Sequence, residues 1–355
     1  MLRDVVCMRG PHAAMLFYGD TRLTRVGGMP TTVLRLLQNK GSVQQLDGPA
    51  HRHRKALFLR LLMEDEESLA RLMDIFRERS LRRLTEWQKR EQIEAAPDIA
   101  QLLAETAFQW TSTPMAVLEK DPTVLSDMVQ NAGHFGPRTW WTLRRRTRLE
   151  AELERTFDGI RNGSVQVAEG SPIAAIAWHR DEDSGLLPAS VAAVELLNIV
   201  RPIVAIARYI VFVALALHNN PAWCDLFETG NDEFLDDFAE EVRRCFPFFP
   251  FVGAVAKQEL DWQGYGIQAG QWLLCDLYGT IHDPRFFPEP HRLKPQRQLS
   301  WKDQNYSFIP QGAGRTEATH RCPGERITID IMKEAVKLFC RHMTYEIAPQ
   351  DLSIP

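Results

Sequence analysis

A cysteine at the start of a helix is the first residue of this chain whose setting could support chemistry. In the stretch FIPQGAGRTEATHRCPGERITIDIMKEAVKLFC, a polar loop with two glycines leads to Cys322, and Pro323 suits the first position of the following helix. Free backbone N–H groups and the helix dipole favour a thiolate there, and His320 and Arg321 add positive charge. Cys322 is therefore a candidate nucleophile, redox sensor or metal ligand, against the alternative of a buried cysteine without a role.

A Glu-x-x-Arg pair lies upstream, in the stretch EEVRRCFPFFP. Glu241 and Arg244 are spaced to share one helical face, and Pro247 ends the helix. Taken alone, such a pair is a surface ion pair worth roughly a few tenths of a kcal/mol. A Lys-Pro-x-Arg turn that ends at Arg297 follows, and then the cysteine loop. This order, and not the spacing of the pair, makes the pair a candidate for a structural role.

An Arg-Pro pair interrupts the apolar stretch ELLNIVRPIVAIARYIVFVALAL. A guanidinium buried there costs several kcal/mol unless Arg201 finds an anion. The anion is either Glu195, which lies on a different helical face, or a ligand carboxylate; alternatively, Arg201 extends to solvent. Pro202 removes the N–H that would bond the Asn198 carbonyl, which opens the helix at that point.

The elements that must position these residues are mostly helices. Apolar residues recur at helical spacing over 50–62, 67–88, 97–110, 143–160, 188–218, 232–245 and 323–341. Short strand-like runs cover 254–260, 271–274 and 343–347. No repeat or low-complexity linker divides the chain. We expect one mainly α domain over residues 1–355, with small β-sheets, whose helices close around a ligand or a long buried helix.

Composition excludes several classes of protein. The chain has 355 residues, 45% of them hydrophobic, and a formal charge of −4, so it is neither disordered nor drawn as a whole to nucleic acid or to an anionic membrane. The one dense basic run, LRRRTRLE at 143–150, could hold phosphates, but the glutamates at 150, 152 and 154 offset it and favour a solvated helix face. His51 and His53 lack cysteine or carboxylate partners at zinc-ligand spacing.

The six cysteines and the N-terminus bear on location. The cysteines lack regular spacing, which favours a reducing compartment over a secreted disulfide framework; they are Cys7, Cys224, Cys245, Cys275, Cys322 and Cys340. The first twenty residues do not resemble a signal peptide, and the longest uncharged apolar run, 209–217, is too short for a membrane span. We expect a cytoplasmic protein without a membrane anchor.

The Glu-x-x-Arg helix, the turn and the Cys-x-Gly helix together resemble the C-terminal half of the cytochrome P-450 superfamily of haem-thiolate enzymes. The resemblance implies haem b, iron protoporphyrin IX, as cofactor and Cys322 as the axial ligand of its iron. It also implies a buried triad of Glu241, Arg244 and Arg297. A thiolate ligand pushes electron density onto iron and favours O–O cleavage.

The chain departs from the usual oxygen-dependent members of that superfamily. Arg315 and Ala318 stand where Phe and Gly are usual, and the central helix lacks the acid and threonine that relay protons. The Arg-Pro pair, the long loop QGAGRTEATHRCPGE and the segment VQQLDGPAHRHRKALF instead resemble the bacterial fatty-acid peroxygenase branch. That branch implies a long-chain fatty acid whose carboxylate pairs with Arg201. It also implies hydrogen peroxide as oxidant and no redox partner.

The same resemblance assigns roles to further residues. The carboxylate held by Arg201 would act as the general acid–base, which favours hydroxylation at the α or β carbon. Gln44 would face the substrate, where glutamine goes with hydroxylation and histidine with decarboxylation; the neighbouring Gln45 leaves the register open by one. Phe248 would wall the pocket, against the alternative of ordinary core packing. The candidate cations for the haem propionates, against the alternative of surface charges, are His51, Arg54 and Arg25.

Other functions stay open at this point. A fatty acid decarboxylase that forms terminal alkenes, a dioxygen- and NAD(P)H-dependent monooxygenase and a non-catalytic binder of haem or fatty acid are the alternatives. The chain starts and stops inside the family pattern, so its N- and C-terminal parts appear shortened. The missing parts usually help to shape the substrate tunnel, so we expect either a more open pocket or a weaker fold.

Overall fold

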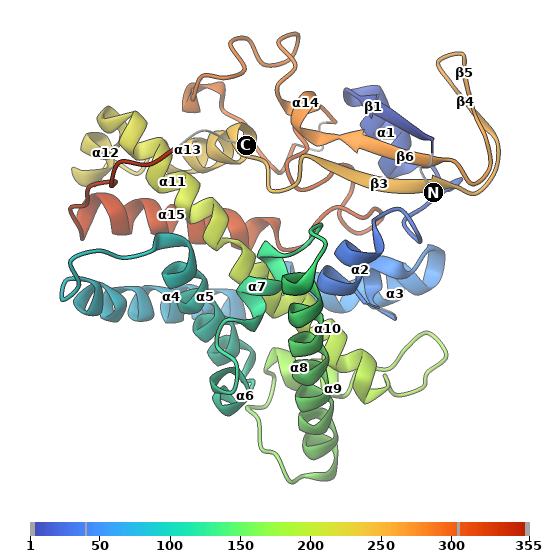
Figure 1. Ribbon diagram of the computed structural model, residues 1–355, viewed down its shortest axis with the longest axis horizontal. Helices are drawn as coiled ribbons and strands as arrows, with labels where there is room; N and C mark the ends of the chain where they lie inside the picture. The colour runs from blue at the N-terminus through green and yellow to red at the C-terminus, as the bar shows by residue number, and fades with distance from the viewer. Residues whose placement is uncertain (1–3, 40, 304–305, 352–355) are drawn as a thin grey trace.

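Helices make up most of the computed structural model, which describes residues 4–39, 41–303 and 306–351 (Figure 1). The first helices are α1 (Pro11–Gly19), α2 (Thr31–Leu37), α3 (Gly48–Leu59), α4 (Glu66–Trp87), α5 (Ala95–Thr111), α6 (Met115–Glu119), α7 (Val124–Gln130) and α8 (Pro137–Asn162). The others are α9 (Pro172–Ala177), α10 (Ala189–Ala205), α11 (Ala207–Asn219), α12 (Pro221–Glu228), α13 (Leu235–Cys245), α14 (Leu277–Ile281) and α15 (Glu325–Arg341).

A four-stranded sheet joins segments from the two halves of the chain, with strand order β1-β6-β3-β2. Its strands are β1 (Val5–Arg9), β2 (Leu23–Thr24), β3 (Phe251–Ala256) and β6 (Trp272–Asp276). Strand β1 runs parallel to β6, and the other two pairs are antiparallel. A separate antiparallel hairpin is formed by β4 (Leu260–Trp262) and β5 (Tyr265–Ile267). The four-stranded sheet lies beside α1, away from α4 to α9 (Figure 1).

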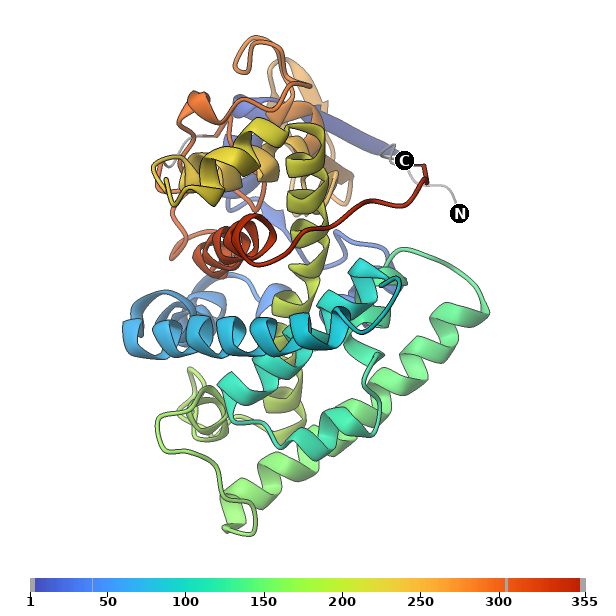
Figure 2. The same ribbon diagram turned by 90° about the vertical axis from the view of Figure 1, so that its left-hand side faces the viewer.

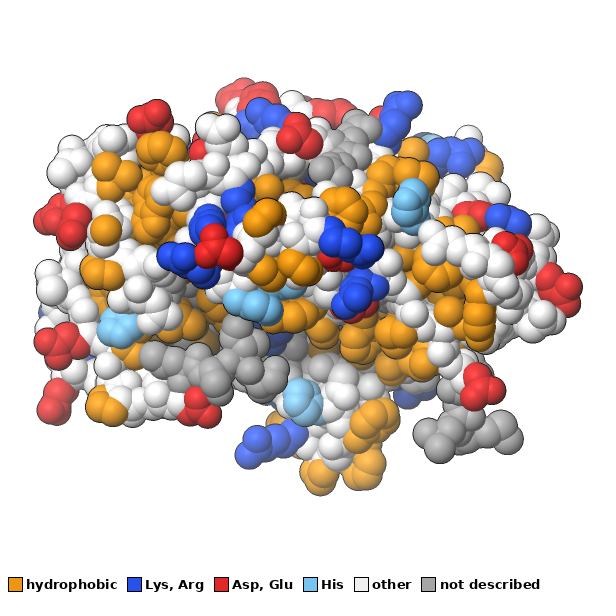
Figure 3. All heavy atoms as spheres, turned by 90° about the horizontal axis from the view of Figure 1, so that it is seen from above, with side chains coloured by type: hydrophobic (Ala, Val, Ile, Leu, Met, Phe, Trp, Pro, Cys, Tyr) orange, Lys and Arg blue, Asp and Glu red, His pale blue; other side chains and the backbone are white. Residues whose placement is uncertain are grey.

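The helical core surrounds α10 and α11, which cross the middle of the molecule (Figure 2). Helix α10 packs against α5 and α8, and α11 packs against α5 and α15. The stretch 189–219 is long and apolar enough to cross a membrane, but 61% of its most apolar window is buried inside the protein. Burial in the core therefore accounts for its apolar composition. On the face seen in Figure 3, acidic and basic side chains are interspersed.

The central helix is interrupted close to the Arg-Pro pair. We predicted one helix over 188–218, whereas the structure has α10 and α11 with Ile206 between them. The Ile206 N–H donates to the Ile203 carbonyl at 3.1 Å, which tightens the helix one turn after Pro202. A proline inside a helix removes one hydrogen bond and crowds the turn before it, so Pro202 weakens α10 on its Asn198 side, and the break at Ile206 lies one turn after the proline.

Most of the predicted elements are present, and one is wrong. The helices predicted over 67–88, 97–110, 232–245 and 323–341 correspond to α4, α5, α13 and α15, and the strand predicted over 254–260 is β3, three residues earlier. The stretch 343–347 is not a strand. Met343 and Tyr345 pack against the helical core, and the Tyr345 hydroxyl donates to the Ala214 carbonyl at 3.0 Å. The alternating apolar residues there reflect packing on a helix surface.

Candidate active site

A cavity of about 330 Å³ lies where α10 meets α11. The α10–α11 junction, the loop that ends at Cys322 and the segment from α2 to α3 form most of its walls. Phe248 and Phe249 close another side. Within the part of the chain that the structure describes, the lining residues include cations but no Asp or Glu. The described lining therefore offers no carboxylate to a ligand.

Cys322 lies in the cavity wall, shortly before α15. Its sulfur accepts a hydrogen bond from the Gly324 N–H, which lowers the pKa of the thiol, as the charges of Lys55 and Arg243 also do. Burial and the Glu325 carboxylate act in the opposite direction, burial most strongly, and the net pKa is raised. The expected effect of the helix start is present at Gly324, but in the protein without metal burial outweighs it. Iron binding would displace the proton.

His320 and Arg321 do not supply the unpaired positive charge that we expected at the cavity. Burial lowers the pKa of His320 to about 2, so its ring is neutral, and the ring lies 4.1 Å from that of His51 between centroids. Burial also lowers the pKa of His51 to about 4. The Arg321 guanidinium is paired with Glu325, with Nε 2.8 Å from the carboxylate. Neither residue adds a free cation at the sulfur.

Lys55 supplies a cation that the sequence analysis missed. Its side chain is buried and lines the cavity, and its ammonium donates to the Thr319 carbonyl and, at 2.9 Å, to the Arg321 carbonyl. Burial lowers the pKa of Lys55 to about 8, so it is charged at neutral pH. Its position four residues after His51 on α3 places both side chains on one helical face. This i,i+4 spacing is the feature of the sequence that could have indicated that Lys55 lies beside His51.

Arg201 lies in the cavity wall and is only 7% exposed, so it does not extend to solvent. Its Nη2 atom makes a weak polar contact with the Asn198 side-chain oxygen, at 3.5 Å. No carboxylate lies at ion-pair distance from Arg201 in the described parts of the chain. Burial, together with repulsion from Arg146, lowers the pKa of Arg201 to about 9. At neutral pH the cavity therefore contains a charged guanidinium that needs an anion.

Glu195 is not the partner of Arg201, because it is paired with Arg54. The Glu195 carboxylate lies 2.7 Å from Arg54 Nη1, and its second oxygen accepts from the Asn198 amide at 2.8 Å. Arg54 also donates from Nε to Asp181 at 2.9 Å. Two carboxylates from distant parts of the chain thus hold Arg54, and it is not among the residues that line the cavity, which disfavours the predicted contact with a haem propionate.

The other two predicted propionate cations lie near one another. His51 lines the cavity. The Arg25 guanidinium lies 3.9 Å from the centroid of the Phe17 ring and donates to the Gly253 carbonyl at 3.3 Å. Its charge is close enough to lower the pKa of both His51 and His320. Contact of His51 and Arg25 with a propionate stays a prediction.

Arg146 belongs to the basic run that we expected to be solvated, and for this residue the expectation is wrong. Its side chain is buried, with Nε 2.9 Å from Glu150 and Nη2 3.3 Å from the Gln38 carbonyl. Its Nη1 is buried without a hydrogen-bond partner in the described chain. The buried residues of α8 recur at 139, 142, 146, 149 and 153, so the helical spacing carried a signal for its burial.

The positions of the two glutamines fix the register of this segment. Gln44 lines the cavity, and its side-chain oxygen is buried without a partner in the described ranges. Gln45 instead donates from its amide to the Gln38 side chain at 2.6 Å. Phe248 lines the same cavity, with its ring centroid 4.8 Å from the Arg208 guanidinium carbon. Gln44 and Phe248 are therefore placed where a ligand would meet them.

The Glu-x-x-Arg pair is buried and forms the predicted triad. Arg244 holds Glu241 with two bonds of 2.8 Å, from Nε and Nη2, and Arg297 Nε lies 3.1 Å from the same carboxylate. A second buried network, which the sequence analysis missed, lies next to it: Arg243 pairs with Glu240 of its own helix and with Glu325 at the start of α15. These pairs fix α13 against the base of the cysteine loop.

Glu241→Gln should lower the free energy of unfolding by about 3–5 kcal/mol, because it leaves two buried guanidinium groups without their counter-charge. Urea unfolding followed by circular dichroism measures the change. Glu78→Gln, which removes one partner of an exposed i,i+4 ion pair, is the control and should change stability by less than about 1 kcal/mol. Equal effects of the two variants would mean that the triad does not support the fold.

Comparisons with known proteins agree with this site. The model of the family described as Cytochrome P-450 matches residues 230–353. The structure of Cytochrome P450SP alpha (CYP152B1) in complex with (R)-ibuprophen has a TM-score of 0.94 and 37% identity, and the match covers 100% of this chain and 87% of that chain. The chain belongs to the cytochrome P-450 family. The solved structures place it in the CYP152 branch, which our sequence analysis identified as the fatty-acid peroxygenase branch.

Two further proteins match less of the chain or match it less closely. Cytochrome P450EX alpha (CYP152N1) with myristic acid has a TM-score of 0.90 and 34% identity, over 99% of this chain and 84% of that one. Dimethylnonatriene synthase from Arabidopsis thaliana is 28% identical over 115 residues, 31% of this chain and 22% of its own length. The match thus spans about a fifth of that curated relative.

The cofactor of this family is haem, and the cavity suits it. The sulfur of Cys322, the buried ammonium of Lys55 and apolar walls are the groups that a thiolate-ligated, propionate-bearing ring requires. The loop beneath the cavity turns at Gly312, where φ is +110° and a Cβ would come within 3.0 Å of the Arg321 Cα. Only glycine permits that turn without strain.

Proposed function

We propose that the protein is a haem-thiolate peroxygenase that uses hydrogen peroxide to hydroxylate long-chain fatty acids at the α or β carbon. One observation carries the proposal: the charged guanidinium of Arg201 lies in a cavity whose described lining contains no Asp or Glu. A buried cation without a counter-ion is costly, and a carboxylate held by the guanidinium fork removes that cost. A fatty acid supplies a carboxylate on an apolar chain, which suits the remaining walls.

Related structures support the choice of ligand. The CYP152N1 structure is one with myristic acid, and a variant of cytochrome P-450 OleT was solved in complex with arachidonic acid. The OleT structure is 30% identical, with a TM-score of 0.91, and its match covers 98% of this chain and 83% of that one. Both ligands combine a carboxylate with a long apolar chain. The cavity between Arg201 and the phenylalanines at 248 and 249 offers the same two kinds of contact.

Each functional residue has its own part in the proposed reaction. Cys322 would hold the haem iron, and the haem would supply the oxidising chemistry at the substrate carbon. Arg201 binds and orients the carboxylate, which takes a proton from peroxide and returns it to the departing oxygen. Because the guanidinium holds the carboxylate inside the cavity, the Cα and Cβ atoms are the carbons nearest to the reacting centre.

The proposal also excludes a need for other partners. We infer that no redox partner is required, because α10 has Arg201 and Pro202 near its C-terminal end in place of an acid and a threonine. We also propose a cytoplasmic location, which the free state of all six cysteines supports. Nucleic acid and membrane have no role in the reaction as proposed.

The experiment that tests the proposal uses haem-loaded protein, myristate and hydrogen peroxide without a reductase. Mass spectrometry should detect 2- or 3-hydroxymyristate. Products that form only when NAD(P)H and a ferredoxin system are added would show a monooxygenase instead. Bound haem and myristate without any product under either condition would identify a non-catalytic binder and end the peroxygenase proposal.

Gln44→His should increase the share of terminal alkene among the products from myristate by several-fold. An imidazole in the cavity wall offers a proton donor and acceptor that the neutral amide lacks. Gas chromatography of the alkene and hydroxy-acid products measures the ratio. Gln45→His is the matched control, because Gln45 pairs with Gln38 and is not among the lining residues, and it should leave the ratio unchanged. If both variants behave alike, Gln44 does not influence the outcome.

A further inference from the structure

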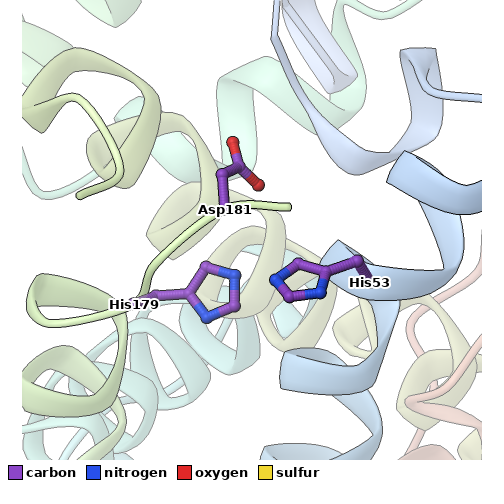
Figure 4. A group of neighbouring side chains, drawn as sticks. All are labelled: His53, His179 and Asp181. Carbon is purple, nitrogen blue, oxygen red and sulfur yellow. The ribbon is translucent and has the colours of Figure 1, made fainter. Parts of the chain in front are cut away.

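A second group of side chains with metal-binding chemistry lies outside the active site. His53 comes from α3, and His179 and Asp181 come from the loop that follows α9. One donor atom from each of the three lies within 4.8 Å of the others. Figure 4 shows the two rings side by side, each with a nitrogen directed towards the other, and Asp181 above them. The partners that the sequence did not place near His53 thus come from a distant part of the chain.

The two imidazoles are prepared to act as ligands. The Nε2 atom of His179 is buried and has no hydrogen-bond partner in the described chain, which is rare for a buried polar atom. His53 is exposed, and its Nε2 lies 2.9 Å from the Arg180 carbonyl, which orients the ring.

Asp181 completes the donor set although it is paired with Arg54. Both of its oxygens accept from the guanidinium of Arg54. A carboxylate offers about four lone-pair sites, so two remain for a metal ion. Hydrogen bonds to a ligating carboxylate are a common outer support of metal sites. The nearby guanidinium of Arg54 repels cations, however, so the bonds from the two imidazoles must supply most of the binding energy. This disfavours Mg²⁺ and Ca²⁺, which prefer oxygen ligands.

The loop after α9 also carries compensating negative charge. A hollow of about 350 Å³ opens beside Asp181, and its lining residues are Asp181, Glu182 and Asp183 together with Arg54, Leu46 and Ala50. Three carboxylates at this hollow offset the guanidinium. We propose that His53, His179 and Asp181 bind one late first-row divalent transition-metal ion, such as Zn²⁺, which would tie α3 to the loop after α9 and leave one coordination position for water.

Zn²⁺ binding to the haem-loaded full chain tests the proposal, and competition with a chromophoric chelator gives its affinity. We expect one ion per chain, no detectable binding of Mg²⁺ under the same conditions, and a loss of Zn²⁺ affinity of at least about tenfold in His53→Ala and in His179→Ala. His218→Ala is the matched control, because His218 is an exposed histidine of α11 outside the cluster, and its affinity should stay unchanged.

Three results would overturn the proposal. They are the absence of stoichiometric Zn²⁺ binding, unchanged affinity in His53→Ala, and loss of the ion in Cys224→Ser. The last would place the ion at the Cys224–Cys340 pair, whose sulfurs are 2.7 Å apart. His53 is exposed, so its replacement leaves the fold intact even if His179→Ala unfolds, and circular dichroism verifies this. The readout needs neither peroxide nor fatty acid, so it is independent of the proposed peroxygenase activity.

Discussion

Arg201→Leu should abolish fatty-acid turnover and at the same time make the protein without fatty acid more stable. The guanidinium is buried with only one weak polar contact in the described chain, and Arg146 repels it. Leucine removes this unpaired charge and fills the space with apolar atoms, so the melting temperature should rise. The same change removes the group that binds the carboxylate, so kcat/KM for myristate should fall at least about 100-fold.

Lost turnover together with a raised melting temperature would distinguish a residue that binds the substrate from one that stabilises the fold. A residue that holds the fold together would lower the melting temperature when it is replaced. Calorimetry without and with myristate checks the stability, and product analysis checks the turnover. Arg201→Lys keeps the charge but loses the fork, so its activity should be intermediate. Arg148→Ala, at an exposed position of α8, is the control and should change neither quantity. Normal turnover in Arg201→Leu would remove the carboxylate anchor from the mechanism.

The guanidinium of Arg201, unpaired within the described chain, lowers the stability of the protein without ligand and provides the binding site for a carboxylate. Burial of a second guanidinium, that of Arg146, beside the first increases the demand for an anion. Glu195 belongs to the same helix but lies on a different face, where Arg54, the Val43 N–H and Asn198 hold it. The protein therefore keeps its own carboxylate away from the cavity. A ligand carboxylate can therefore form the ion pair with Arg201 that no carboxylate of the described chain forms, and this ion pair favours binding.

Features that depend on local spacing could be predicted from the sequence. The contact between Glu241 and Arg244 follows from i,i+3 spacing on a helix, although its burial does not, and the setting of Cys322 follows from a loop, a proline and an amphipathic helix. The apolar neighbours of Arg201 left burial and extension to solvent open, and the structure decides for burial. In the first two cases the decisive neighbours are close in the sequence, so periodicity and turn chemistry contain the information.

Features that depend on contacts between distant parts of the chain could not be predicted from the sequence. Arg54 looked like a propionate ligand until the fold brought Asp181 and Glu195 to it, 127 and 141 residues away. The cluster around His53 was missed for the same reason, since its partners come from a loop after α9. The strand predicted over 343–347 failed because a strand needs an edge to pair with, and alternation alone does not supply one.

Cys322→Ala should remove the strongly red-shifted carbon-monoxide band that a thiolate-ligated haem gives, and with it fatty-acid turnover. The sulfur is the donor in the cavity wall that can bind iron as a thiolate and push electron density onto it. Because burial keeps the thiol protonated without metal, the haem-free variant should fold with nearly unchanged stability. The carbon-monoxide difference spectrum, haem content and urea unfolding of the haem-free protein measure these three quantities.

The matched control is Cys275→Ala, which removes a fully buried cysteine of β6 that does not line the cavity. It should keep the red-shifted band although it opens a small void in the core. A Cys322→Ala protein that keeps the band would assign the iron to another ligand, and Cys245 would be the next thiol to replace. Loss of the band together with unchanged haem-free stability would show that Cys322 serves the cofactor and not the fold, because only the metal-bound state needs its charge.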